Sequence, residues 1–285
     1  MSASKAKESK LSSVSKLGII AGSGQLPHLL VATCQKQNIT PYILAFDGHT
    51  DHELVEGLDH IWTHLGALQK NINWLKSNDV QDLVFCGGIK RPSIRQMKPD
   101  FRATKFFARH SLRALGDSDL LSAVKQEIAK DGFTMHGVHD FIDDILTGEG
   151  TLGTLSPSKV NESDIKHGMM IAQEIGRLDI GQAVVIQDGV VIGVEGVEGT
   201  DALIKRVKPL LKKSKNKGVL VKACKPQQDK DLDLPTIGID TIQNISESGL
   251  AGVAVHANNS LILDPQAVTK CADRLGVFVY GAKPS

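Results

Sequence analysis

The sequence is poor in aromatic residues, nearly balanced in charge and free of long hydrophobic runs. Only 4% of its residues are aromatic, which argues against a surface that stacks the bases of single-stranded nucleic acid. The formal net charge of +1 argues against a chain that coats a nucleic-acid backbone. No apolar run approaches the roughly 18 residues that indicate a transmembrane helix. We therefore expect no nucleic-acid partner and no membrane-spanning segment.

Cysteine is scarce as well, and the N-terminal residues lack the features of a secretory signal. The four cysteines form no CxxC pair, which favours free thiols in a reducing compartment over a zinc site. Residues 1–16 are rich in serine and lysine and contain no apolar core, so they predict a disordered tail. Together these absences indicate a cytoplasmic protein.

What the sequence does contain is the composition of a globular protein, with 41% hydrophobic and 23% charged residues. A chain of 285 residues is long enough for two domains. Strand-like apolar runs alternate with helical patterns in both halves, which predicts an α/β fold. Residues 147–157 are rich in glycine, threonine and serine and form the best linker candidate. We therefore predict a Rossmann-like domain at 17–147 and a second α/β domain at 148–285.

A glycine-rich turn follows the first predicted strand, residues 17–21. Gly22, Ser23, Gly24 and Gln25 separate this strand from a helical pattern. Glycines permit close approach of the backbone, and a helix N-terminus favours an anion, so this turn suits a phosphate. A dinucleotide fingerprint would have glycine where Pro27 stands, so a simple tight turn between strand and helix remains the alternative.

A second glycine turn follows the predicted strand at 82–86. Gly87 and Gly88 come first, and the cations Lys90 and Arg91 follow. In an open α/β sheet, ligands lie beyond the carboxyl ends of the strands. The two glycine turns therefore predict one shared ligand site. The basic stretch 101–113 is interpreted as a solvated helix face, with a membrane-surface patch as the alternative.

The second half contains a predicted hairpin and a further helix start. Asp188-Gly189 between two β-branched runs is a strong hairpin signal. Gly199, Thr200 and Asp201 precede a helical pattern, where Thr200 or Asp201 would cap the helix. The exposed amides of such a helix start would also suit a phosphate.

Residues 225–238, which we call the aspartate segment, are unusually dense in charge. The segment has three carboxylates, at Asp229, Asp231 and Asp233, and its two prolines stiffen it. Asp233 lies at the edge of an apolar run, where partial burial would tune a carboxylate or let it hold a metal ion. We take Asp233 as the candidate reactive group, and a solvated loop is the alternative interpretation.

An ordered set of motifs gives the chain a resemblance to a known family. The motifs include LGIIAGSGQLP from residue 17, RP at 91, GD at 116, EIGRLDIGQ from 174, EGTD from 198, KP at 225 and DLPTIG from 233. The sequence resembles the LpxI-type UDP-2,3-diacylglucosamine pyrophosphatases of bacterial lipid A biosynthesis. The motifs run in order from residue 17 past 238, so the resemblance covers essentially the whole chain except the tail.

The resemblance implies a cleft between two α/β domains that binds UDP-2,3-diacylglucosamine. Water would attack the α-phosphorus with the help of Mg²⁺ or another divalent cation, giving UMP and the acylated glucosamine 1-phosphate. The family's catalytic aspartate corresponds to Asp233, which would bind the metal ion or orient the water. The resemblance also implies a cytoplasmic enzyme with peripheral contact at the inner membrane, and a homodimer. The predicted substrate contacts are Gly22, Ser23, Gly24, Gln25, Gly87, Gly88, Gln182, Gly199, Thr200, Asp201, Lys222, Lys225 and Thr236.

One position departs from the family pattern, because Asp231 stands where members commonly have arginine. Two other functions fit parts of the sequence. The Gly-Ser-Gly turn would suit a nucleotide-cofactor oxidoreductase, with Asp47 as a ribose ligand. A non-catalytic module that binds nucleotide sugars is the second alternative.

Overall fold

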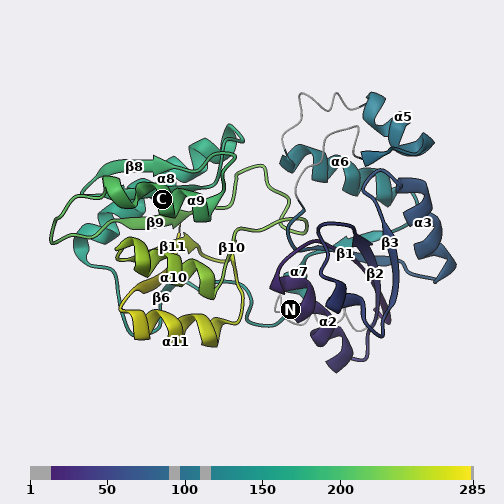
Figure 1. The fold of residues 1–285 in the computed structure, drawn as a ribbon, viewed down its shortest axis with the longest axis horizontal. Coiled ribbons are helices and arrows are strands. Elements are labelled where there is room, and N and C mark those ends of the chain that lie inside the picture. Colours follow the sequence, from purple (N-terminus) through teal and green to yellow (C-terminus); the bar gives the residue numbers. More distant parts are fainter. Residues whose placement is uncertain (1–13, 90–96, 110–116, 284–285) are drawn as a thin grey trace, which may run out of the picture. The chain divides into compact units, whose positions relative to one another are not determined.

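The computed structural model describes residues 14–89, 97–109 and 117–283 (Figure 1). The chain forms two compact units. The N-terminal unit extends to Asp143 and also includes Asp229–Asp233. The C-terminal unit comprises Asp144–Gln228 and the chain from Leu234 onward. Most of the aspartate segment thus belongs to the C-terminal unit, while its central five residues pack with the N-terminal one.

The N-terminal unit contains a parallel sheet of five strands in the order β3-β2-β1-β4-β5. This order and the parallel pairing are those of a Rossmann-like sheet, so the predicted fold of the first domain is confirmed. The strands are β1 (Lys16–Ala21), β2 (Thr40–Phe46), β3 (Asp59–Thr63), β4 (Asp82–Cys86) and β5 (Thr134–His136). The helices are α2 (Gln25–Lys36), α3 (Leu68–Ser77), α5 (Phe101–Arg109), α6 (Asp117–Ala129), α7 (Val138–Phe141) and the 3-10 turn η1 (His52–Val55).

Helices cover both faces of this sheet (Figure 1). Ile72 and Leu75 of α3 and Ile128 of α6 pack in one core with Leu44 of β2 and Leu83 of β4. Helix α2 packs against β1, β2 and β4 on the opposite face, together with α7. Continuous apolar runs such as that of β1 are expected for parallel strands that are buried on both faces.

The C-terminal unit has a mixed sheet of six strands in the order β6-β13-β11-β9-β7-β8. β9, β11 and β13 are parallel, whereas β6, β7 and β8 run antiparallel to their neighbours. The strands are β6 (Gly150–Leu152), β7 (Ala183–Gln187), β8 (Val190–Val194), β9 (Val219–Lys222), β11 (Gly252–His256) and β13 (Phe278–Ala282), and a separate parallel pair is formed by β10 (Thr236–Ile237) and β12 (Leu261–Ile262). The helices are α8 (Lys159–Arg177), α9 (Thr200–Val207), α10 (Ile239–Ser248), α11 (Pro265–Leu275) and the 3-10 turn η2 (Lys208–Leu210).

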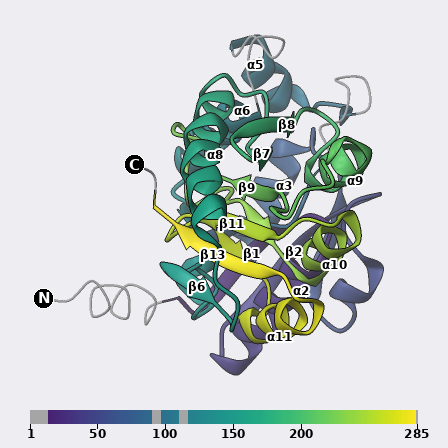
Figure 2. The same cartoon turned by 90° about the vertical axis from the view of Figure 1, so that its left-hand side faces the viewer.

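Side chains that point alternately to the two faces of the strands divide the core of the C-terminal unit into two layers. Val184 and Ile186 of β7 face α8, while Ala183 and Val185 face the layer of α9, α10 and α11. Figure 2 shows α8 on one side of the sheet and the three other helices on the other. Because successive side chains of a strand point to opposite faces, a strand of buried residues supplies both layers.

The hairpin predicted around Asp188-Gly189 is confirmed as β7 and β8, with positive φ at both turn residues. The predicted linker is wrong in part, because residues 150–152 form β6 and pair with β13. A short stretch rich in glycine and threonine gives little sign that it forms a strand. Here the strand forms because it pairs with β13, more than 120 residues further along the chain.

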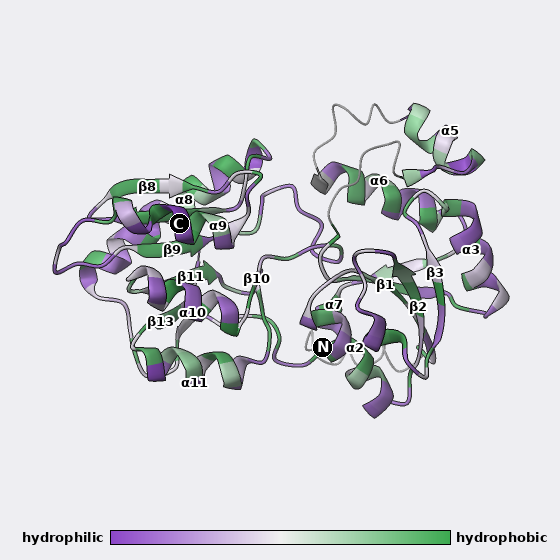
Figure 3. Cartoon of the chain, viewed as in Figure 1, coloured by the Kyte–Doolittle hydropathy of each residue, from purple (hydrophilic) through white to green (hydrophobic). Residues whose placement is uncertain are grey.

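Hydrophobic residues concentrate in the strands, and the outer helices carry many hydrophilic residues, as α3 does (Figure 3). In the part of the chain that the structure describes, no helix combines the length and apolarity needed to cross a membrane. The basic residue Arg102 of α5 forms ion pairs with Glu127 and Asp131. Two carboxylates of the same unit therefore balance its charge.

Candidate functional site

The two predicted glycine turns meet at the carboxyl ends of the adjacent strands β1 and β4. The Ser23 amide donates to the Gly88 carbonyl at 2.8 Å, and the Gly88 amide donates back to the Ser23 carbonyl at 3.0 Å. The Ser23 hydroxyl also donates to the Gly88 carbonyl, at 3.0 Å. The structure therefore brings together the two turns that the sequence placed at one end of the sheet.

This meeting requires glycine at Gly22 and Gly87. A Cβ on Gly22 would lie 2.5 Å from the Gly88 carbonyl oxygen, closer than real Cβ atoms approach. Gly87 has φ of 89°, and its Cβ would lie 2.6 Å from the Ser23 carbonyl oxygen. The glycines thus serve backbone packing between the turns. Ser23, Gly24 and Gln25 remain exposed at the start of α2.

Helix α2 begins without a side-chain cap and without an acidic residue in its first turn. Its first amides can therefore receive an anion. Lys90, Arg91, Pro92 and Gly116, which the sequence analysis singled out, lie outside the described residues.

A second set of predicted residues gathers at one edge of the C-terminal sheet. Ala183 of β7 pairs with Lys222 of β9, and the Ala223 amide donates to the Gln182 carbonyl at 2.9 Å. The Lys222 ammonium donates to the Thr236 carbonyl at 3.2 Å. Gln182, Lys222 and Thr236 thus lie at the carboxyl end of β9, where a ligand of a parallel sheet is expected.

Glu195, which is not among the residues that the sequence indicates, connects this edge to the start of α9. One of its carboxylate oxygens accepts the Gln182 amide at 2.8 Å, and the other accepts the Thr200 hydroxyl at 2.5 Å. The residue is 6% exposed. The sequence does contain a signal for Glu195, because this carboxylate directly follows an apolar strand and comes shortly before the Gly-Thr-Asp motif. A charged group that is buried in the fold needs hydrogen-bond partners of this kind.

The expectation that Thr200 or Asp201 caps α9 is wrong. The N-cap is Gly199, with φ of 80° and no side-chain cap bond. The Thr200 hydroxyl is bonded to Glu195, and Asp201 accepts a bond from Asn244 at 3.1 Å. The first amides of α9 are therefore not satisfied by a capping side chain, which suits an anion at this helix start.

Lys222 is a buried ammonium, only 8% exposed. Among the described residues, no carboxylate lies within ion-pair distance of it, and its ammonium donates to the neutral Thr236 carbonyl. Lys225 differs, because its ammonium pairs with Asp179 at 2.5 Å. Burial of an unpaired charge is costly, so Lys222 is the better candidate for an anionic ligand.

Asp233 is exposed, so the expected partial burial of its carboxylate is wrong. Its neighbours Leu232 and Leu234 are buried, and its amide donates to the Asp229 carbonyl at 3.2 Å. The two leucines anchor the chain on either side, because their apolar side chains leave water. Asp233 thus lies at an exposed position on an anchored stretch of backbone.

The unusual Asp231 has a clear structural partner. The Lys125 ammonium bonds to Asp229 at 2.7 Å and to Asp231 at 2.9 Å. Burial alone would lower the pKa of Lys125, but the hydrogen bonds that its ammonium donates to the two carboxylates outweigh burial and raise this pKa. Asp231 therefore helps to hold the aspartate segment against α6.

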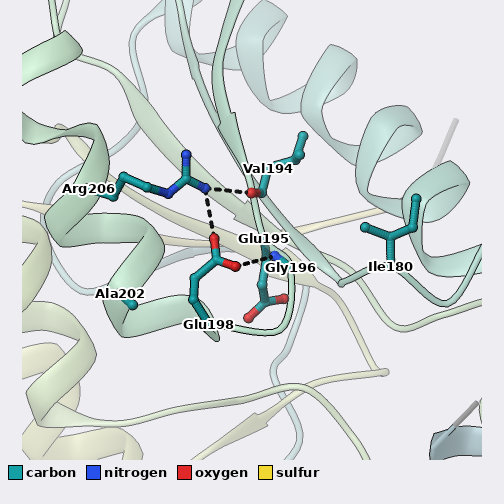
Figure 4. Close-up of a pocket in the computed structure, with 7 residues that line it drawn as sticks. All are labelled: Ile180, Val194, Glu195, Gly196, Glu198, Ala202 and Arg206. Atoms are coloured by element: carbon teal, nitrogen blue, oxygen red, sulfur yellow. Dashed lines mark hydrogen bonds and ion pairs between the residues drawn. The ribbon is translucent and has the colours of Figure 1, made fainter.

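An open pocket of about 550 Å³ adjoins the Glu195–Thr200 connection (Figure 4). Its apolar wall consists of Ile180, Val194 and Ala202. At its rim, Arg206 pairs with Glu198 at 2.8 Å and donates to the Val194 carbonyl. Glu195 lines the pocket and also bonds to Gln182 and Thr200. The pocket therefore lies next to the predicted contacts at this edge of the sheet.

The described residues also include a group that could hold a metal ion, formed by His139, Asp140 and Asp231. Asp233, the predicted metal ligand, is not a member of this group. Its predicted role therefore stays a prediction, as does a cleft between the two domains.

The fold defines a two-domain α/β protein with a Rossmann-like first domain. Family models match both parts of the chain: the LpxI N-terminal domain matches residues 16–145, and the LpxI C-terminal domain matches residues 148–280. The chain belongs to the LpxI family. It is 36% identical over 277 residues to a protein of Caulobacter vibrioides named UDP-2,3-diacylglucosamine pyrophosphatase LpxI, covering 94% of this chain and 98% of that relative.

Solved structures show weaker likenesses. The biotin carboxylase subunit of pyruvate carboxylase matches with a TM-score of 0.26 and 11% identity, over 61% of this chain and 35% of that one. The biotin carboxylase domain of 2-oxoglutarate carboxylase from Hydrogenobacter thermophilus matches with a TM-score of 0.23 and 12% identity, over 62% of this chain and 35% of that one. Likenesses at this level carry no argument about function.

Proposed function

We propose that this protein hydrolyses the pyrophosphate of UDP-2,3-diacylglucosamine, giving UMP and 2,3-diacylglucosamine 1-phosphate for lipid A biosynthesis. The name of the Caulobacter relative supplies the substrate. The structural observation that carries the proposal is Lys222, a buried ammonium that has no carboxylate partner among the described residues. A pyrophosphate group would provide the missing negative charge.

The neighbours of Lys222 suit the same ligand. The uncapped start of α9 offers backbone amide donors, and Glu195 holds this helix start in place by accepting the Thr200 hydroxyl and the Gln182 backbone amide. Preorganised donors of this kind stabilise the charge that develops on a phosphoryl group during displacement. The exposed amides at the start of α2 are proposed to contribute a second set of phosphate donors.

In the proposed reaction, a water oxygen bonds to the α-phosphorus while the bond from this phosphorus to the bridging oxygen breaks. The bridging oxygen leaves with the sugar phosphate, and the water oxygen remains in UMP. Asp233 is the proposed catalytic residue, as a base that orients the water or as a metal ligand. An exposed carboxylate fits Mg²⁺, because this ion keeps several of its waters when bound to one or two protein oxygens. When bound, Mg²⁺ would neutralise charge on the phosphates.

The apolar wall beside Glu195 is proposed to receive an acyl chain of the substrate. Ile180 is 50% exposed and Val194 is 36% exposed, although both side chains are apolar. Exposed apolar surface beside convergent polar groups is typical of a ligand site. A cytoplasmic location, peripheral contact at the inner membrane and a homodimer stay predictions that follow from the family resemblance.

Release of UMP from UDP-2,3-diacylglucosamine, measured in water enriched in ¹⁸O, tests the proposal. We expect the label in UMP and not in the sugar phosphate, and we expect turnover to need a divalent cation and to stop with EDTA. Asp233→Ala should abolish turnover and leave binding of the UDP-sugar largely intact. The matched control is Asp240→Ala, which removes another exposed carboxylate and should leave turnover nearly unchanged.

Turnover by the Asp233→Ala protein at the native rate would refute the catalytic role of Asp233. Label in the sugar phosphate would place the attack at the other phosphorus. Binding of the UDP-sugar without hydrolysis by the native protein would favour the non-catalytic alternative, and dependence on a nicotinamide cofactor would favour the oxidoreductase.

A further inference from the structure

We infer that His139, Asp140 and Asp231 form a binding site for a divalent transition-metal ion such as Mn²⁺ or Zn²⁺. All three belong to the N-terminal unit. Each offers one ligand atom, and the three atoms lie within 4.8 Å of one another. The presence of this site does not rest on the proposed function; only the positioning role that we draw from it below does.

The spacing is close to that of a metal site. Nitrogen and oxygen ligands bind such ions at about 2.0–2.2 Å, so two ligands of one ion lie at most about 4.4 Å apart. Small side-chain rotations would therefore bring the three atoms into one coordination sphere. His139 and Asp140 are adjacent on α7, whereas Asp231 lies about ninety residues further along the chain. The fold, and not local sequence, brings this set together.

The fold also restricts each ligand. The His139 ring lies over Gly137, where a Cβ would come within 2.3 Å of the ring. One oxygen of Asp140 accepts the Gly137 amide at 3.1 Å, and one oxygen of Asp231 accepts the Lys125 ammonium at 2.9 Å. A carboxylate has two oxygens, so these bonds orient the groups and leave a second oxygen for a metal ion. Such supporting bonds are typical of metal ligands.

The chemistry of the ligands decides between ions. An imidazole with two carboxylates suits Mn²⁺, Zn²⁺ and similar ions, whereas Mg²⁺ and Ca²⁺ prefer oxygen ligands alone. Two partly buried carboxylates at this distance also repel each other, and a bound cation would remove that repulsion. We therefore expect this site to prefer Mn²⁺ or Zn²⁺, whereas the site proposed at Asp233 would prefer Mg²⁺.

Metal binding here would act on the aspartate segment. Asp231 belongs to the five residues Asp229–Asp233 that pack with the N-terminal unit, and Lys125 already holds Asp229 and Asp231. A metal ion shared with α7 would add a second attachment two residues before Asp233. We therefore expect His139 and Asp140 to act as positioning residues for the backbone that carries Asp233.

Titration of the full-length, EDTA-treated protein with Mn²⁺, followed by electron paramagnetic resonance, tests the site. We expect bound Mn²⁺ in the native protein to show pulsed-resonance coupling to an imidazole nitrogen. His139→Gln should remove this coupling, and Asp231→Asn should weaken Mn²⁺ binding at this site about tenfold or more. The matched control is Asp143→Asn, an exposed carboxylate just after α7, which should keep both the coupling and the affinity.

The Asp233→Ala protein separates this inference from the proposed function. It should lose turnover but keep the Mn²⁺ site with its nitrogen coupling. Absence of the coupling in the native protein refutes the inference without the need for any variant. Equal Mn²⁺ affinity and unchanged coupling in native and His139→Gln proteins would refute it as well. Loss of the UMP-forming activity alone would leave the inference standing.

Discussion

The Glu195 carboxylate accepts the Thr200 hydroxyl at 2.5 Å, and its second oxygen accepts the Gln182 amide at 2.8 Å. One buried carboxylate thus fixes the start of α9 against the edge of β7. Bonds to a charged group are stronger than neutral ones, so this connection sets the positions of two predicted substrate contacts.

Glu195→Gln should weaken substrate binding without removing the chemistry. Glutamine has one acceptor oxygen where glutamate has two, so one of the two donors loses its partner. We expect KM for the UDP-sugar to rise about tenfold, the equivalent of about 1.4 kcal/mol, with a smaller effect on kcat. Steady-state UMP release measures this. Glu198→Gln, which removes an exposed carboxylate at the pocket rim, serves as the control, and an equal change in both proteins would contradict the role given to Glu195.

Val194→Asp should discriminate between substrates with and without long acyl chains. It places a charge on the apolar wall beside Glu195, where burying that charge under an acyl chain is costly. We expect KM to rise at least about tenfold for the long-chain diacyl substrate, and to change little for a short-chain analogue. Val191→Asp is the matched control, because Val191 is similarly exposed on β8 but does not line the pocket. Equal KM changes for both substrates would refute the acyl-chain site.

Gly22→Ala should destabilise the N-terminal unit. The new Cβ would meet the backbone of Gly87 and Gly88 at 2.5–2.7 Å, and backbone atoms cannot rotate away. We expect the free energy of unfolding to fall by about 1–3 kcal/mol, measured by chemical denaturation. Gly148→Ala is the control, because a Cβ there meets nothing within 4 Å. Native stability in the Gly22→Ala protein would mean that the two turns can separate.

Asp131→Asn should reveal a pH-dependent contribution to stability. Hydrogen bonding to Arg102 holds the pKa of the Asp131 carboxyl below its ordinary value of 3.8, and Lys76 lowers it further. A carboxyl with a lowered pKa in the folded state stabilises the fold above its unfolded pKa, and this effect is lost as the pH falls through the folded pKa.

We therefore expect Asp131→Asn to lower the free energy of unfolding by about 1.5–3 kcal/mol at pH 7. The difference from the native protein should shrink as the pH falls below 3.8. Denaturation at pH 7, 5 and 3 measures this. The control is Asp79→Asn, which removes an exposed ion pair with Lys16. Its free energy of unfolding should differ from that of the native protein by no more than about 0.5 kcal/mol at each of these pH values. A difference for Asp131→Asn that grows at low pH would contradict the argument.

Local patterns in the sequence predict most of the elements. The apolar runs of β1 and β4 and the Asp188-Gly189 hairpin lie where the sequence indicates. These features depend on side-chain periodicity and on the backbone freedom of glycine, which neighbouring residues specify. The same logic placed both glycine turns at the carboxyl ends of strands, and β1 and β4 proved to be neighbours.

The candidate site follows from the sequence less completely. The predicted substrate contacts include Lys222, Thr236 and Thr200, but not Glu195, whose role appears only when β7 and β8 bring it beside Gln182. The expected burial of Asp233 was wrong, because apolar neighbours in sequence anchor a chain without covering the side chain between them.

The sequence by itself determined the α/β class, the two-domain organisation, most helices and strands, and the family to which the chain belongs. Only the tertiary structure decided that Asp229–Asp233 pack with the N-terminal unit, that residues 150–152 complete the C-terminal sheet, and that Asp231 meets Lys125, His139 and Asp140. The physical reason is distance along the chain. Dihedral preference and periodicity act over a few residues, whereas these contacts join segments about ninety to one hundred and thirty residues apart, and only packing of the whole fold selects them.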